Sequence, residues 1–96
     1  MRIDKVLKEK RDEVLQIAAS YGARNVRIFG SLARGEAGPD SDIDILVNLD
    51  SGRSLLDIIA LKQDLEDLLG CEVDVVTEEA ISPYIREQVL KEMVSL

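Results

Sequence analysis

Two short apolar segments enclose a glycine turn and a pair of alternating carboxylates, and this arrangement constrains the fold more than any other feature. Residues 25–29 run directly into Gly30. The mostly apolar segment 43–49 begins directly after Asp42 and contains Asp44 as its second residue. Successive side chains of a strand point to opposite faces, so Asp42 and Asp44 share one face and the isoleucines around Asp44 occupy the other. The sequence therefore predicts two strands joined by a loop, with two carboxylates at the start of the second strand.

The two carboxylates indicate a cation site. At about 4 Å and an effective dielectric of about 20, their repulsion is on the order of 4 kcal/mol. A divalent ion removes that repulsion, and Mg²⁺ prefers one or two carboxylates together with substrate phosphates and water. An ordinary acidic strand end that faces solvent is the alternative interpretation.

The segments 30–35 (Gly-Ser-Leu-Ala-Arg-Gly) and 41–47 (Ser-Asp-Ile-Asp-Ile-Leu-Val) together resemble the signature of the DNA polymerase β-like nucleotidyltransferase superfamily. More narrowly, they resemble its minimal nucleotidyltransferases, although Leu32 stands where arginine is frequent. The resemblance implies Mg²⁺-dependent transfer of a nucleoside monophosphate, AMP from ATP, to a hydroxyl group. It also implies a HEPN-domain toxin as partner, modified on a tyrosine and silenced in a hetero-oligomer with this chain, which acts as the antitoxin.

By this resemblance, Asp42 and Asp44 bridge two Mg²⁺ ions and a third carboxylate comes from a neighbouring strand. The valine-rich segment 72–76 supplies Asp74, and an acid placed in such a strand normally requires a partner or a metal. A strand-end charge without function is the alternative for Asp74. The predicted catalytic and metal-binding residues are therefore Asp42, Asp44 and Asp74.

The predicted nucleotide-binding residues follow the first strand. Gly30 lets the backbone approach the triphosphate closely. Ser31 offers a hydroxyl and an N–H group to phosphate oxygens. Arg34 lies on the same short turn and is expected to neutralise a phosphate, with an ion pair to Glu36 as the alternative.

Composition narrows the class of protein. A chain of 96 residues makes one domain, residues 1–96. A single cysteine and the absence of histidine exclude common zinc sites and Ser-His or Cys-His catalysis, and the lone cysteine fits a cytoplasmic location. The chain has no apolar run of membrane-spanning length. Its net charge of −7 disfavours direct binding to long nucleic acids, which depends on Lys and Arg.

Periodicity predicts helices over residues 4–20, from Ser54 to Leu69 and from Ser82 onward, with strands over 25–29, 43–49 and 72–76. The fold class is α/β (α+β), a minimal polymerase β-like nucleotidyltransferase fold with a small mixed sheet of about three or four strands and helices packed on one face. The predicted core stripe of the middle helix comprises Leu55, Ile58, Ile59, Leu65, Leu68 and Leu69. The last helix carries a stripe of Ile85, Val89 and Met93, broadened by Leu90, Val94 and Leu96, that packs on the sheet or docks a partner.

Two other functions remain open. A non-catalytic binding module could neutralise its partner sterically, with the acidic residues providing complementarity. A nucleotidyltransferase that modifies a small molecule such as an antibiotic is the third alternative, which the lack of a second domain disfavours.

Overall fold

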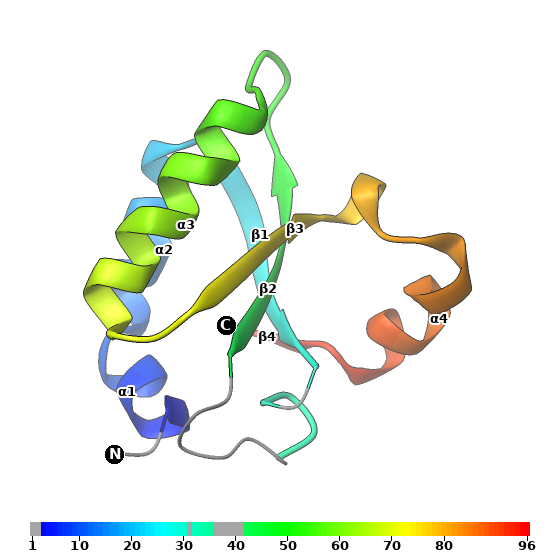
Figure 1. Ribbon diagram of the computed structural model, residues 1–96, viewed down its shortest axis with the longest axis horizontal. Coiled ribbons are helices and arrows are strands. Elements are labelled where there is room, and N and C mark those ends of the chain that lie inside the picture. The colour runs from blue at the N-terminus through cyan, green and yellow to red at the C-terminus, as the bar shows by residue number, and fades with distance from the viewer. Residues whose placement is uncertain (1–2, 31, 36–41) are drawn as a thin grey trace.

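The computed structural model describes residues 3–30, 32–35 and 42–96 (Figure 1). In chain order the elements are α1 (Ile3–Glu9), α2 (Arg11–Ser20), β1 (Ala23–Phe29), β2 (Ile43–Leu49), α3 (Leu55–Leu69), β3 (Val73–Thr77), the 3₁₀ turn η1 (Glu78–Ala80), α4 (Pro83–Glu92) and β4 (Val94–Ser95). This order confirms the predicted α/β class. Within these described residues, no helix combines the length and the apolar character needed to cross a bilayer.

The strands form one mixed sheet in the order β3-β2-β1-β4. β1 pairs antiparallel with both β2 and β4, whereas β2 and β3 are parallel and are connected through α3. The register places Asp44 between Phe29 of β1 and Asp74 of β3. Two of the predicted carboxylates are therefore neighbours across two strands.

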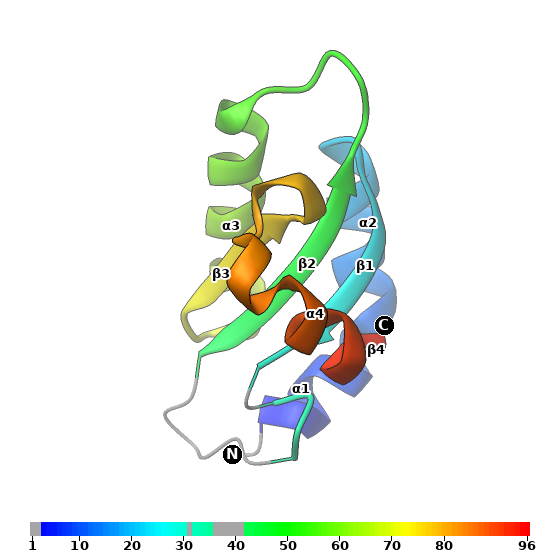
Figure 2. The same ribbon diagram turned by 90° about the vertical axis from the view of Figure 1, so that its right-hand side faces the viewer.

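The main core lies between the sheet and the helices α1, α2 and α3, on one side of the sheet (Figure 1). It contains the fully buried side chains Val14, Ile43, Ile45, Val47, Leu61, Leu65 and Val73. α4 lies across the opposite face (Figure 2), where Val89 and Ile81 pack with Leu46 in a second, smaller cluster. The prediction that the helices pack on one face is therefore wrong for α4, which partly covers the face on which the carboxylates were expected because its buried Val89 packs with Leu46 there.

The N-terminal helix differs from the prediction of one helix over residues 4–20. It is interrupted at Lys10, whose backbone (φ −104°, ψ 15°) leaves the helical conformation and whose Nζ donates a hydrogen bond to Leu68 O at 3.0 Å. The change of direction lets Val6 and Leu7 enter the core, with only 7% and 5% of their surfaces exposed. Tertiary packing overrides the continuous helical pattern here.

The ends of α3 were predicted correctly, but part of its core stripe was wrong. Ser54 forms a capping box with Asp57, and Gly70 ends the helix in the left-handed conformation. Leu55 and Ile59 are exposed at 71% and 44%, and Leu61 enters the core in their place. The reason is helical phase: at 3.6 residues per turn, Leu61 and Leu69 lie about 40° either side of Leu65, whereas Ile59 lies about 120° away from it. Leu55 lies in the first turn of α3.

The C-terminal segment also departs from the prediction. α4 begins at Ser82-Pro83 as expected but ends at Glu92, so Val94 and Leu96 do not extend its apolar stripe. Instead Val94 and Ser95 pair with β1, and Leu96 N donates to Val26 O at 3.1 Å. The added strand satisfies backbone groups that the edge of β1 would otherwise leave unpaired.

Candidate active site

The three predicted carboxylates lie at one end of the sheet, where Asp44 is partly buried and Asp42 and Asp74 are exposed. Asp44 and Asp74 are the second residues of β2 and β3 and lie directly opposite each other in the parallel register. Asp42 precedes β2 and shares the face of Asp44 because strand side chains alternate. This face is also the one that α4 partly covers, since Leu46 follows Asp44 by two residues.

The electrostatics of Asp44 reflect this convergence. Partial burial raises the pKa of its carboxyl group, and the negative charges of Asp74 and Asp42 raise it further, as does a hydrogen bond with Asp74. The positive charge of Arg34 acts in the opposite direction on the pKa of Asp44. Two other carboxyl groups and one guanidinium therefore lie within electrostatic reach of Asp44.

The residues present fit a magnesium ion. The mutual repulsion that raises the pKa of Asp44 is the repulsion that a cation would remove, and the donors are the hard oxygens that Mg²⁺ prefers. Among the described residues, no group of three or more acidic or cysteine side chains is arranged to hold a metal ion by itself. Mg²⁺ commonly takes one or two carboxylates and completes its shell with water and substrate phosphates, so the site suits an ion that arrives with a nucleotide.

Gly30 lies against the carboxylates. Its φ is +76°, and a Cβ atom there would lie 3.2 Å from Asp44 Cγ and in direct collision with Asp44 Oδ2. The sequence suggested glycine at this position for close approach to phosphates. The structure gives a second reason, because the glycine makes room for the Asp44 carboxylate.

Arg34 lies close enough to Asp44 for its positive charge to act on that carboxyl group. Its backbone N–H donates to Gly30 O at 3.2 Å, and its Nη1 lies 3.0 Å from Glu92 Oε2 of α4. Glu92 is a partner that the sequence analysis did not identify, since 58 positions separate the two residues.

Some predictions concern residues outside the described ranges. Ser31, the alternative partner Glu36 and residues 36–41 of the loop expected between the two strands all lie there. The roles proposed for them stay predictions.

A buried polar cluster on the same face was also missed. Arg27 of β1 is only 4% exposed, and its Nη2 donates to Asn48 Oδ1 at 2.7 Å and lies 3.4 Å from Glu78 Oε2. Asn48 Nδ2 donates to the same Glu78 oxygen at 3.0 Å. The alternating pattern of β1 places Arg27 on the carboxylate face, but only the fold brings Glu78 to it.

Known families and proteins include clear relatives of this chain. Residues 4–96 match the family described as nucleotidyltransferase domain. The chain is 43% identical over 79 residues to the protein adenylyltransferase MntA of Thermococcus cleftensis, and the matched segment covers 82% of this chain and 80% of that protein.

Solved structures show the same fold. A candidate minimal nucleotidyltransferase superposes with a TM-score of 0.88 at 50% identity, covering 100% of this chain and 97% of the other. A complex of a tri-AMPylated HEPN toxin with an MNT antitoxin from Shewanella oneidensis matches with a TM-score of 0.70 at 20% identity, covering 92% of this chain and 69% of the other. The second likeness concerns the fold alone.

Proposed function

We propose, on the premise that this chain belongs to the nucleotidyltransferase domain family, that it transfers AMP from ATP to a hydroxyl group of a protein partner. The chain belongs to this family because residues 4–96 match the family and because it is 43% identical over 79 residues to a protein adenylyltransferase. The observation that carries the proposal is the in-register pair Asp44 and Asp74, with Asp42 on the same face and the Gly30 turn beside it. In the reaction, the acceptor hydroxyl oxygen forms a bond to the α-phosphorus of ATP and the hydroxyl proton passes to solvent water. The bond from the α-phosphorus to the oxygen that bridges it to the β-phosphorus breaks, and pyrophosphate leaves.

Asp42, Asp44 and Asp74 are the residues that would hold Mg²⁺, with two ions in the full site. When bound, the metal would offset the charge of the triphosphate and of the departing pyrophosphate. Asp44 and Asp74 lie on two adjacent strands, which give them a rigid support. This support would favour the alignment of the triphosphate with the attacking oxygen that in-line displacement needs. ATP is the proposed donor.

The triphosphate would lie along the turn after β1. The Gly30 backbone, the Ser31 hydroxyl and the Arg34 guanidinium are the groups assigned to its oxygens. The proximity of Arg34 to Asp44 supports this placement, because the same guanidinium can reach a phosphate bound beside the carboxylates.

The proposed acceptor is a tyrosine hydroxyl of a HEPN-type toxin, with this chain as its cytoplasmic antitoxin. The T. cleftensis relative is named a protein adenylyltransferase, and the S. oneidensis complex pairs an MNT antitoxin with an AMPylated HEPN toxin. The net charge of −7 supports a basic macromolecular partner, since complementary potentials steer association.

The experiment is to incubate a HEPN-domain partner that co-purifies with this chain with ATP and Mg²⁺, and to measure its intact mass. The partner is expected to gain one or more adenylate masses with the wild-type protein. Asp42→Asn should still bind the partner but leave its mass unchanged. If Asp42→Asn also neutralises the toxin in cells as well as wild type does, the function is steric binding.

A further inference from the structure

Glu92, at the last turn of α4, has both carboxylate oxygens engaged. Gln88 Nε2 donates to its Oε1 at 3.2 Å, and Arg34 Nη1 donates to its Oε2 at 3.0 Å. These two contacts lower the pKa of Glu92, the bond from Gln88 more than that from Arg34. The carboxylate is thus oriented from within its own helix and presents its second oxygen to Arg34.

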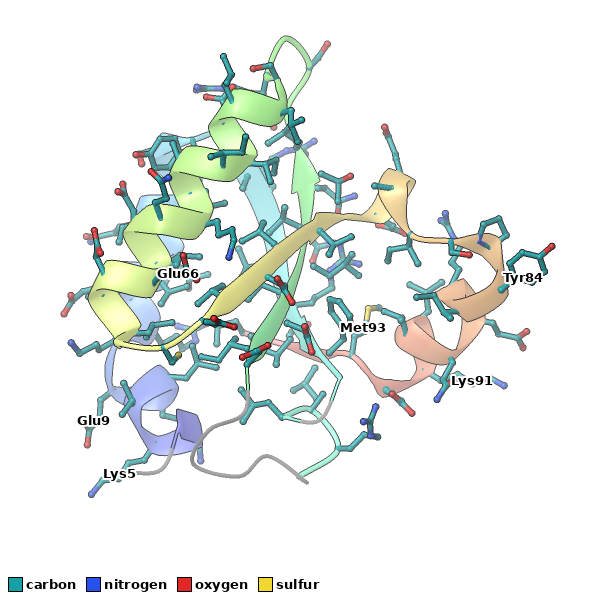
Figure 3. All side chains as sticks on the ribbon, in the orientation of Figure 1. Lys5, Glu9, Glu66, Tyr84, Lys91 and Met93 are labelled. Carbon is teal, nitrogen blue, oxygen red and sulfur yellow. The ribbon has the colours of Figure 1, made fainter. Side chains whose placement is uncertain are left out.

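The backbone that carries Glu92 is fixed to the sheet. Val89, one turn earlier, is 7% exposed and packs with Leu46. Met93, the next residue, packs against the same cluster and accepts a weak contact from Arg27 Nη1 at 3.6 Å. In Figure 3, Met93 points toward the sheet, whereas Tyr84 and Lys91 of α4 point outward. Glu92 therefore stands on the anchored end of the helix.

Arg34 lies outside the helices and strands, in the described segment 32–35. Its side chain is 38% exposed. A long arginine side chain loses rotamer freedom when it binds a ligand, and that loss is smaller if a neighbour already holds it in place. A guanidinium carries five N–H donors, so a bond to Glu92 is compatible with bonds to phosphate oxygens.

We propose that Glu92 is a positioning residue for nucleotide binding, which holds Arg34 at the carboxylate end of the sheet so that its guanidinium meets the triphosphate. The inference rests on the proposed function, because it takes the triphosphate to be the ligand of Arg34. Glu92 itself does not contact the nucleotide. Glu92 acts on nucleotide binding only through Arg34. The helix that carries Glu92, α4, packs on the opposite side of the sheet from the main core.

The first test measures the Kd for Mg-ATP by calorimetry. Glu92→Ala should weaken binding about threefold to fivefold, the range expected of one partly exposed ion pair. Glu87→Ala is the matched control, since Glu87 is a glutamate on the same helix, is paired with Lys91 at 3.3 Å and is 83% exposed. This control should bind Mg-ATP as wild type does, and both variants should retain the wild-type melting temperature within a few degrees.

The second test repeats Glu92→Ala in an Arg34→Ala background. If Glu92 acts through Arg34, the second substitution adds no further loss of affinity. Three results would each overturn the inference. They are an equal loss of affinity in both backgrounds, unchanged Mg-ATP binding by Glu92→Ala, and tighter binding by Glu92→Ala because a competitor for Arg34 was removed. If the wild-type protein itself fails to bind Mg-ATP, the proposed function fails first and this inference falls with it.

Discussion

At the scale of single residues, Asp44 is the one carboxyl group of the described residues whose pKa is clearly raised. Its pKa is raised above the ordinary 3.8 by burial and by Asp74 and Asp42, so the folded state binds the proton more tightly than the unfolded state. Protonated Asp44 therefore stabilises the folded state at a pH below its ordinary pKa. This stabilisation is lost as the pH rises from the ordinary pKa through the raised pKa.

Asp44→Asn should remove this loss. Without metal, we expect its melting temperature at neutral pH to equal or exceed that of wild type, with the difference closing below the ordinary pKa of aspartate. Thermal melts with a chelator across this pH range are the measurement. Nucleotide transfer should be abolished in the same variant, and a variant that melts below wild type at neutral pH would contradict the reasoning.

Gly30 provides the second prediction at this scale. An alanine at its φ of +76° costs about 1–2 kcal/mol in backbone strain, and its Cβ would also displace the Asp44 carboxylate. Gly30→Ala should therefore lower both the stability and the affinity for Mg²⁺ with nucleotide.

Gly52→Ala is the matched control for Gly30→Ala. Gly52 has a φ of +87°, but a Cβ atom added there would meet no atom from elsewhere in the described residues within 4 Å, so the strain is similar without the collision. Chemical denaturation should show a loss of stability for both variants, at least as large for Gly30→Ala, while calorimetry should show normal Mg-ATP binding only for Gly52→Ala. Normal binding by Gly30→Ala would show that Asp44 tolerates the displacement.

The residues of the site differ in how well the sequence predicts them. The shared face of Asp42 and Asp44 follows from strand alternation, and Asp74 required only that 72–76 be a neighbouring strand. The contact of Gly30 with Asp44 and the ion pair of Arg34 with Glu92 depend on how distant segments meet, which no local pattern contains.

At the scale of secondary-structure elements, the cluster of Arg27, Asn48 and Glu78 joins β1, β2 and η1. Arg86 of α4 also approaches Glu78, with its Nη2 at 3.4 Å from Oε1. A hydrogen bond from Asn48 is the main cause that lowers the pKa of Glu78, with the charges of Arg27 and Arg86 adding to it. The cluster attaches η1 and α4 to the sheet across the carboxylate face.

Glu78→Gln should reveal this attachment through pH. A carboxylate with a lowered pKa stabilises the folded state above its ordinary value of 4.5, and that contribution is lost as the pH falls through the lowered pKa. The variant should be less stable than wild type at neutral pH, and the difference should close in acid. Urea denaturation at both pH values measures it, with Glu79→Gln, an exposed neighbour in η1, as the control. A loss that persists unchanged in acid would mean that the charge of Glu78 is not its cause.

The elements follow the sequence where the signal is local. The capping box at Ser54, the glycine end of α3 and the proline start of α4 were all readable from a few residues. The interruption at Lys10 and the end of α4 at Glu92 were not, because each serves contacts with a distant element: Leu68 in the first case and β1 in the second.

At the scale of the whole molecule, charge decides how a nucleotide can bind. The protein carries a net charge of −7, and three of its carboxylates lie at the candidate site, where a polyanionic triphosphate would bind. Arg34 supplies one positive charge against this repulsion. A nucleotide without a divalent cation should therefore bind poorly, even though the glycine turn and the arginine are in place.

Ligand stabilisation measures this directly. At a Mg-ATP concentration about 100 times its Kd, the folded state gains about 2.7 kcal/mol, and each kcal/mol raises the melting temperature of a domain of this size by about 4–8 °C. We expect a rise of roughly 10–20 °C with ATP and Mg²⁺, little change with ATP and a chelator, and little change with Mg²⁺ and ATP in Asp42→Asn. An equal rise with chelator present would mean that the nucleotide binds without metal. In that case the repulsion among Asp42, Asp44 and Asp74 would have to be relieved by protonation, and the rise in melting temperature would then grow as the pH is lowered.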